Sequence, residues 1–254
     1  MKLYYQTIGE GRPLVILHGL FGSSDNWRGI AKTLSDYAQV ISVDLRNHGQ
    51  SPHSVKQTYA LMAEDLAELC DRLKLDKVNI IGHSMGGKVA MAFSQRYPQY
   101  IDKLVVVDIA PKQYHDAHSH IFKALLALDL SLYTNRSDVD NALKMTLPNK
   151  AVRQFLLMNL ELSGEALSWR LNLQALYDNY SELLDAVCED ETVMIPSSFI
   201  RGGQSDYILE DDEDLIRTRF PYSELVTIEQ AGHWLHADAP QQFLSKITEF
   251  FDYD

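Results

Sequence analysis

The chain has 254 residues, of which 46% are hydrophobic and 23% charged, a composition ordinary for a globular protein that buries a large core. Its net charge of -12 argues against a nucleic-acid partner, because phosphate binding needs a cationic patch, and it disfavours anionic membranes too. Cys70 and Cys188 lie far apart, which excludes a disulfide framework and fits a reducing cytoplasm. The N-terminal residues contain no long apolar run, so we expect neither a signal peptide nor a transmembrane helix.

Short β-rich runs alternate with amphipathic segments along the first 110 residues. Strands are predicted at Leu3–Ile8, Leu14–Leu17, Val40–Val43, Val78–Ile81 and Leu104–Val107, and helices at Tyr59–Leu73 and Gly86–Tyr97. The turn Gly9-Glu10-Gly11 indicates that the first two strands form a hairpin. The alternation predicts an α/β fold with a mostly parallel, twisted sheet and helices on both of its faces.

A helical block interrupts this alternation from residue 111 to residue 191. Strand signals vanish there, and apolar residues recur at helical spacing, as in Phe122, Leu125 and Leu126. Strands return at Pro196–Ile200 and Leu225–Ile228, and a last helix is predicted at Phe243–Phe251. Insertions at the carboxyl end of a strand lie over the ligand site of open α/β sheets. We therefore interpret residues 111–191 as a helical lid on a core of residues 1–110 and 192–254; a purely structural subdomain is the alternative.

The segment Gly82-His83-Ser84-Met85-Gly86 follows a predicted strand and precedes a predicted helix. This is the context of a nucleophile elbow, where a serine occupies a sharp, strained turn. Small residues two positions before and after the serine let the strand and the helix pass closely. We predict Ser84 as the nucleophile, with a tight turn devoid of chemistry as the alternative.

A second glycine-rich turn, His18-Gly19-Leu20-Phe21-Gly22, follows the strand at Leu14–Leu17. Such a turn can bring a backbone N–H toward the elbow, where an oxyanion hole needs two donors. We predict the N–H groups of Leu20 and Met85 as these donors, with Phe21 as the alternative to Leu20. His18 is expected to hold the turn.

His233 lies just after the last predicted strand, from which a loop can deliver it to Ser84 as the general base. A carboxylate must orient its imidazole, and two candidates exist. Asp108 ends one predicted strand, and Asp206 closes the turn after another. Their positions in the sequence do not decide which of the two is the triad acid.

Two other segments give only weak evidence for a functional site. The segment from Tyr114 to His120 holds three histidines and Asp116, but its close spacing matches no standard metal site. We expect a solvated entrance to the lid there, and no metal. The acidic run Glu210–Asp214 predicts the first turn of a helix, where the helix dipole favours negative charge, and it lacks the loop glycine of a calcium site.

Together these motifs resemble the α/β-hydrolase superfamily, and within it the small bacterial esterases related to α/β-hydrolase domain-containing protein 11. The resemblance is carried by six segments on both sides of the lid: His18–Ser23, Asp44–Gly49, Gly82–Lys88, Val107–Pro111, Gly202–Ser205 and Ala231–Trp234. It implies the α/β-hydrolase fold, with the helical lid inserted after the sixth strand. It also implies a cofactor-free esterase acting on acyl esters or thioesters.

The resemblance also bears on individual residues. In the narrower family, a serine at the position of Ser205 accompanies an acid on the preceding strand, so the acid is assigned to Asp108 and a supporting hydrogen bond to Ser205. Asp44, Arg46 and His48 recur in the superfamily beside the oxyanion turn. We expect Asp44 and Arg46 to form a buried pair, with substrate contact as an alternative role for His48.

The motifs and the resemblance together thus imply two-step acyl transfer in the cytoplasm by Ser84, His233 and Asp108, on a small-molecule ester and without cofactor or metal. An acyl-CoA-type thioesterase, and another triad hydrolase or a lyase on the same scaffold, remain alternatives. A non-catalytic binding protein that uses the pocket is expected to lack a triad member, whereas this chain offers candidates for all three.

Overall fold

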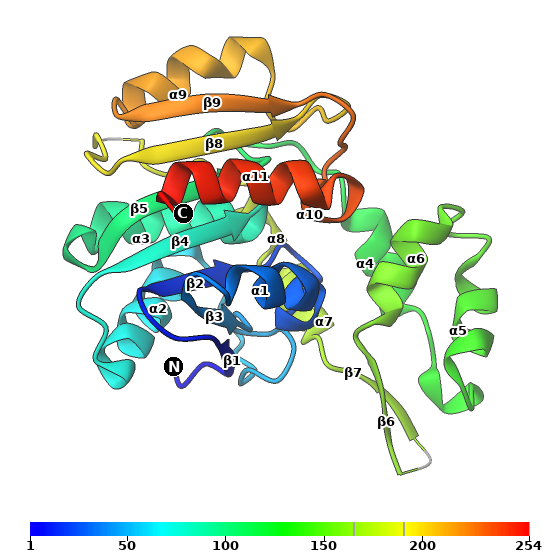
Figure 1. Cartoon of the computed structure of the whole chain (residues 1–254). Helices are drawn as coiled ribbons and strands as arrows, with labels where there is room; N and C mark the ends of the chain where they lie inside the picture. The colour runs from blue at the N-terminus through cyan, green and yellow to red at the C-terminus, as the bar shows by residue number, and fades with distance from the viewer. Residues whose placement is uncertain (165, 190, 254) are drawn as a thin grey trace.

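The computed structural model describes residues 1–164, 166–189 and 191–253, and within them a seven-stranded sheet forms the centre of the molecule (Figure 1). Its strands are β1 (Tyr5–Ile8), β2 (Pro13–Leu17), β3 (Gln39–Val43), β4 (Val78–His83), β5 (Ile101–Val107), β8 (Ser197–Gly202) and β9 (Ser223–Ile228). They lie in the order β1-β3-β2-β4-β5-β8-β9. Only β1 runs antiparallel to its neighbour, which confirms the predicted, mostly parallel sheet.

The predicted hairpin between the first two strands is wrong. β1 pairs with β3, and β2 pairs with β3 on one side and with β4 on the other. Both edges of β2 are therefore taken by parallel partners, which leaves β1 on the rim of the sheet. Gly9 and Gly11, with φ values of 79° and 100°, turn the chain between β1 and β2, and a Cβ on Gly9 would lie 2.4 Å from the Ala38 carbonyl oxygen.

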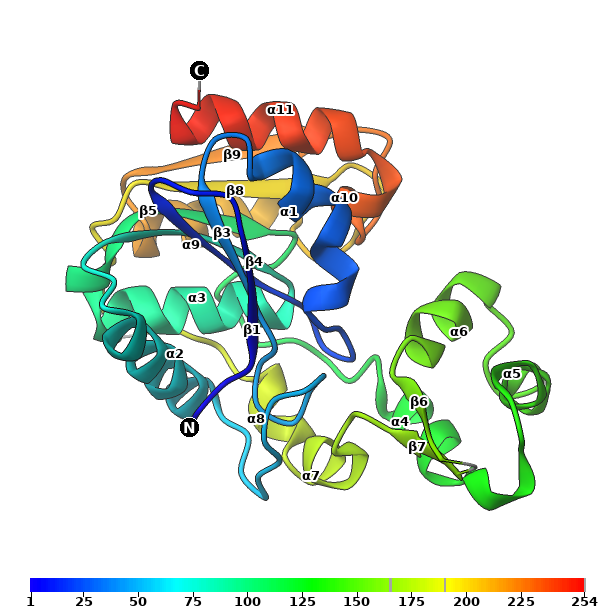
Figure 2. The same ribbon diagram turned by 60° about the horizontal axis from the view of Figure 1, so that its bottom comes forward.

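Helices cover both faces of the sheet, as predicted, and Figure 2 shows the two layers. One face carries α2 (Tyr59–Leu73) and α3 (Met85–Arg96), and the other carries α1 (Arg28–Leu34) and α11 (Pro240–Phe251). Each layer has its own apolar core: Leu66 and Phe93 belong to the first, and Trp27 and Phe243 to the second. The apolar side of each amphipathic helix thus packs on one face of the sheet.

The remaining elements of the core are short. They are the helices α9 (Glu213–Arg219) and α10 (Leu235–Asp238) and the 3-10 helices η1 (Ser24–Trp27), η2 (Pro98–Tyr100) and η4 (Glu210–Asp212). The acidic run Glu210–Asp214 fills η4 and the first turn of α9, which confirms that prediction. Among the described residues, none of the helices is both long and apolar enough to cross a membrane.

Most of the segment that we propose as the lid, residues 119–169, projects from one side of the core in both views, and residues 172–184 lie against the core (Figures 1 and 2). Its elements are α4 (Ser119–Leu126), η3 (Leu130–Leu132), α5 (Arg136–Leu143), α6 (Lys150–Leu157), β6 (Leu160–Ser163), β7 (Ala166–Trp169), α7 (Leu173–Asp178) and α8 (Tyr180–Leu184). The segment follows β5, the fifth strand of this chain and not the sixth, because a single antiparallel strand precedes the parallel ones.

The proposed lid is not wholly helical, contrary to the sequence prediction. β6 and β7 pair as an antiparallel hairpin in which Leu160 lies opposite Trp169. Both strands are four residues long, too short for an alternating pattern to stand out in the sequence. Leu160 is buried at the start of this hairpin.

Candidate active site

The predicted strand-turn-helix context of Ser84 is confirmed. Ser84 lies between β4 and α3 with φ 52° and ψ -120°, a conformation that L-residues rarely adopt. Its backbone N–H donates to the Val107 carbonyl at 2.9 Å, which ties the turn to β5. A Cβ on Gly82 would lie 2.4 Å from the Gly86 carbonyl oxygen, and one on Gly86 would lie 2.5 Å from the Leu17 carbonyl oxygen. Only glycine fits at either place, so the close approach of strand, helix and neighbouring strand holds the turn in its strained form.

The turn between β2 and η1 lies directly beside Ser84. A Cβ on Gly19 would be 3.3 Å from the Ser84 Cβ. Leu20 follows Gly19, and Met85 is the first residue of α3. Among the described residues, neither the Leu20 nor the Met85 N–H has a hydrogen-bond partner. The two candidate oxyanion donors therefore flank Ser84 with their N–H groups available.

Two buried histidines hold the backbone of this region. The His18 Nε2 accepts a hydrogen bond from the Leu45 N–H at 3.0 Å, so its Nδ1 carries the hydrogen and donates to the Gly19 carbonyl at 2.8 Å. His18 thus holds the turn, as predicted. His48 is fully buried, contacts the Arg46 carbonyl and is not among the cavity-lining residues. Burial lowers the pKa of His18 to about 4 and that of His48 to about 3, so both stay neutral.

Asp108, and not Asp206, contacts His233. The Asp108 carboxylate is fully buried at the end of β5 and accepts a hydrogen bond from His233 Nδ1 at 2.7 Å. It also accepts the Gly202 N–H at 3.0 Å and the Ser205 hydroxyl, the contact that the resemblance implied. Asp206 is exposed and forms no hydrogen bond to His233 in the described part of the chain. Three donors thus fix the Asp108 carboxylate, which in turn orients the imidazole.

Ser84 and His233 open into one cavity of about 610 Å³ between the core and the proposed lid. Its apolar lining includes Leu20 and Trp234 from the core, and Ile121, Phe155 and Leu156 from the lid segment. Within the described residues, Ser84 Oγ makes no hydrogen bond to His233; such contacts are often long without substrate and tighten when it binds. The cavity can receive an apolar chain whose reactive group reaches Ser84.

Lys88 is a cavity-lining residue that sequence reasoning missed. It lies one helical turn after Ser84, is 1% exposed and donates to the backbone carbonyls of Leu184 and Asp185 at the end of the lid segment. Its ammonium group also lies 4.8 Å from the centre of the Tyr114 ring, a cation–π contact. Burial lowers its pKa to about 7. The sequence signal that could have identified it is the occurrence of a lysine within an otherwise apolar helical pattern.

The histidines at the start of the lid segment differ from one another. His115 and His120 are exposed, as the prediction of a solvated entrance requires. His118 instead is partly buried, lines the cavity and contacts the Tyr180 hydroxyl at 3.1 Å. Burial lowers its pKa to about 4. In the described ranges, no group of three or more His, Cys, Asp or Glu side chains is placed to hold a metal ion.

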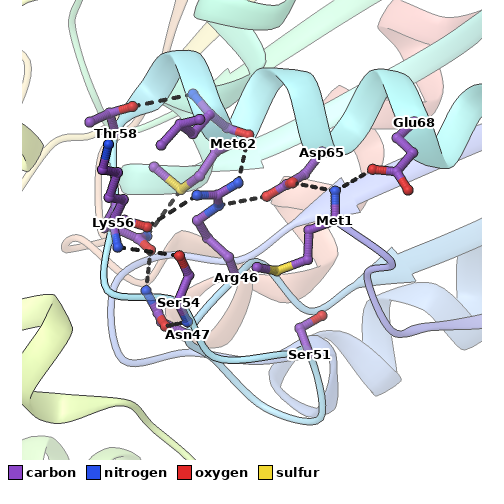
Figure 3. Close-up of polar contacts among 12 residues, drawn as sticks. Met1, Arg46, Asn47, Ser51, Ser54, Lys56, Thr58, Met62, Asp65 and Glu68 are labelled. Carbon is purple, nitrogen blue, oxygen red and sulfur yellow. Dashed lines mark hydrogen bonds and ion pairs between the residues drawn. The ribbon is translucent and has the colours of Figure 1, made fainter.

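The expected pair between Asp44 and Arg46 is wrong. Figure 3 shows Arg46 pointing toward α2, where its Nε lies 2.6 Å from the Asp65 carboxylate. Asp44 instead accepts the backbone N–H groups of Ser24 and Gln50 at 2.7 and 2.8 Å. Both residues lie after the end of β3, and each carboxylate has its own donors: backbone N–H groups for Asp44, and the Arg46 guanidinium for Asp65.

Comparisons with known proteins agree with this architecture. The α/β-hydrolase fold family matches residues 12–240. The sn-1-specific diacylglycerol lipase ABHD11 of Danio rerio is 39% identical over 95% of this chain and 79% of its own, and Esterase YbfF of Escherichia coli is 38% identical over 97% and 96%. A solved marine microorganism esterase is 43% identical, with a TM-score of 0.96 over 98% of this chain and 99% of that one. The chain belongs to the α/β-hydrolase fold family.

Proposed function

We propose that this protein is a serine esterase that hydrolyses carboxylic acyl esters through an acyl-enzyme, with Ser84, His233 and Asp108 as its triad. The observation that carries the proposal is the hydrogen bond of 2.7 Å from His233 Nδ1 to the buried Asp108, since His233 and Ser84 line the same cavity. Relatives named esterase and lipase, similar over nearly the whole chain, support the same reaction class.

In the first step, His233 takes the proton of Ser84 as the serine oxygen attacks the ester carbonyl. Asp108 fixes the tautomer that leaves Nε2 free to act as the base, and it stabilises the imidazolium that forms. The N–H groups of Leu20 and Met85 donate to the oxyanion of the tetrahedral intermediate. His233 then protonates the leaving alkoxide, and the acyl group stays on Ser84.

In the second step, His233 takes a proton from a water molecule that attacks the acyl-enzyme, and it returns this proton to the Ser84 oxygen as the carboxylic acid leaves. The same two N–H groups receive the second oxyanion. Each oxyanion donor is typically worth about 100- to 1000-fold in rate, so their preorganised positions are a large part of the catalysis.

The cavity favours a substrate with an apolar acyl or alcohol group. Its lid side includes aliphatic and aromatic side chains such as Ile121 and Phe155, together with polar ones near the start of the lid segment such as His118. An acyl-CoA-type thioester presents the same carbonyl and is the second candidate substrate, since the triad chemistry is shared. The small-molecule ester is our first choice because relatives of this chain are named as an esterase or lipase.

We also propose that the protein works in a reducing compartment such as the cytoplasm. Cys70 and Cys188 are both free and buried. Burial raises the pKa of each thiol to about 12, so neither is a reactive thiolate at neutral pH.

The test is kcat/KM on p-nitrophenyl esters from acetyl to palmitoyl, with Ser84→Ala beside the wild type. We expect the variant to lose about 10⁵-fold or more in kcat, as serine hydrolases do without their nucleophile. A fluorophosphonate should label the wild type and not the variant. Ester hydrolysis that survives in Ser84→Ala would refute the mechanism. An unreactive wild type that binds esters would favour a binding protein, and activity on acyl-CoA alone would favour the thioesterase.

A further inference from the structure

The Tyr207 ring stacks on the imidazole of His233. The two ring centres are 3.8 Å apart and the planes are inclined by 17°. Tyr207 belongs to the loop after β8 that also carries Ser205. Its N–H donates to the Ser205 hydroxyl at 3.3 Å, and that hydroxyl donates to Asp108. One loop therefore supports both the carboxylate and the face of the imidazole.

Tyr114, at the start of the lid segment, fixes the backbone of Tyr207. Its hydroxyl donates to the Tyr207 carbonyl at 2.7 Å and accepts the Ala110 N–H at 2.8 Å. Ala110 lies two residues after Asp108, at the end of β5. The loop that carries Tyr207 is thereby tied to the strand that carries the proposed acid.

The backbone of His233 has a separate anchor. The His83 Nε2 contacts the His233 carbonyl at 2.8 Å, and because a carbonyl only accepts, this nitrogen carries the hydrogen. The His83 bond and the Asp108 bond fix one backbone atom and one ring atom of His233. Neither bond packs against the face of the imidazole, which the Tyr207 ring covers.

We propose that Tyr207 is a positioning residue for His233: its stacked ring fixes the plane of the imidazole, with Nε2 turned toward Ser84, and Tyr114 holds Tyr207 in place. This inference rests on the proposed function, in which His233 is the base. The phenol also presents its π-face to the imidazolium that forms in each step, an arrangement that favours the cation. Burial raises the pKa of Tyr207, so the ring stays a neutral phenol.

The test compares Tyr207→Leu with Tyr207→Phe. The Tyr207 hydroxyl forms no hydrogen bond within the described residues, so phenylalanine keeps the ring and the stack and is the matched control. We expect kcat to fall about tenfold in Tyr207→Leu with KM within about threefold, because aromatic pairs contribute energies of this order. Tyr207→Phe should stay within about twofold of wild type. Tyr114→Phe, which keeps a ring but loses both hydroxyl bonds, should lie between them.

Three outcomes would overturn the inference: a kcat in Tyr207→Leu within twofold of wild type, an equal loss in Tyr207→Phe, or a change confined to KM, which would make Tyr207 a pocket wall only. Thermal unfolding of each variant confirms that it is folded. Ser84→Ala and His233→Ala are measured in parallel. If both are inactive while Tyr207→Leu is unaffected, the positioning role of Tyr207 is refuted and the proposed function is not. If His233→Ala stays active, the proposed function itself fails.

Discussion

The strand ends that carry the proposed chemistry and the lid segment that covers them are built differently. Ser84 and Asp108 stand at the ends of the neighbouring strands β4 and β5, both with positive φ values, 52° and 51°. Each is held by a backbone hydrogen bond of 2.9 Å to the next strand. The lid segment instead leaves large apolar side chains such as Met145 and Leu132 exposed, at 92% and 73%. The backbone of the core thus positions the residues of the proposed triad, whereas the cavity is lined by side chains of the core and of the lid segment.

If the core alone carries the chemistry, the largest effect after the loss of Ser84 should come from Asp108. We expect Asp108→Asn to lower kcat by about 10⁴-fold, because an amide can stabilise the wrong imidazole tautomer while preserving the shape of the site. Asp206→Asn is the matched control and should stay within a few-fold of wild type, since Asp206 does not contact His233. The measurement is kcat on a short acyl ester. The opposite ranking of the two variants would assign the acid to Asp206.

Lys88 connects the core with the lid segment. Its titration should make the free energy of unfolding depend on pH. Its pKa falls from the ordinary 10.5 to about 7 on folding, so between these values the unfolded chain binds more protons than the folded protein. The free energy of unfolding should therefore rise with pH from about 7 to 10, by at most ~1.4 kcal/mol per pH unit. In Lys88→Met this contribution disappears.

Urea unfolding of the wild type and Lys88→Met between pH 7 and 10 measures the difference. We expect the wild type to gain stability relative to the variant as the pH rises. Lys123→Met, which removes an exposed lysine of α4, is the control and should follow the wild type. Parallel curves for wild type and Lys88→Met would show that Lys88 keeps its proton throughout this range.

The smallest effect should come from the wall of the cavity. Phe155 lines the cavity from α6 and packs on Trp234, with ring centres 5.5 Å apart. We expect Phe155→Ala to lower kcat/KM for an octanoyl ester by about tenfold and for an acetyl ester by less than threefold, because only the longer chain reaches this wall. Met145→Ala, at an exposed lid position, should change neither. Equal losses on both esters would place Phe155 in the chemistry and not in chain recognition.

Much of the core could be predicted because its signals are local. The helix at Tyr59–Leu73 has the bounds that its apolar spacing predicted, and the sequence around Ser84 has glycines where a side chain would collide. The lid segment was less predictable. The β6–β7 hairpin is too short to leave a periodic signal, and the burial of His118 depends on Tyr180, 62 residues away.

The sequence by itself determined the α/β alternation, the elbow at Ser84 and the loop position of His233, because each depends on residues that are neighbours in the chain. By spacing, Asp108 and Asp206 were equally good candidates for the triad acid, and only the resemblance favoured Asp108. The tertiary structure alone decided which carboxylate meets His233, where β1 pairs, and that Arg46 turns to Asp65. Those contacts join segments far apart in sequence, and the order of strands in the sheet, which no local pattern encodes, brings them together.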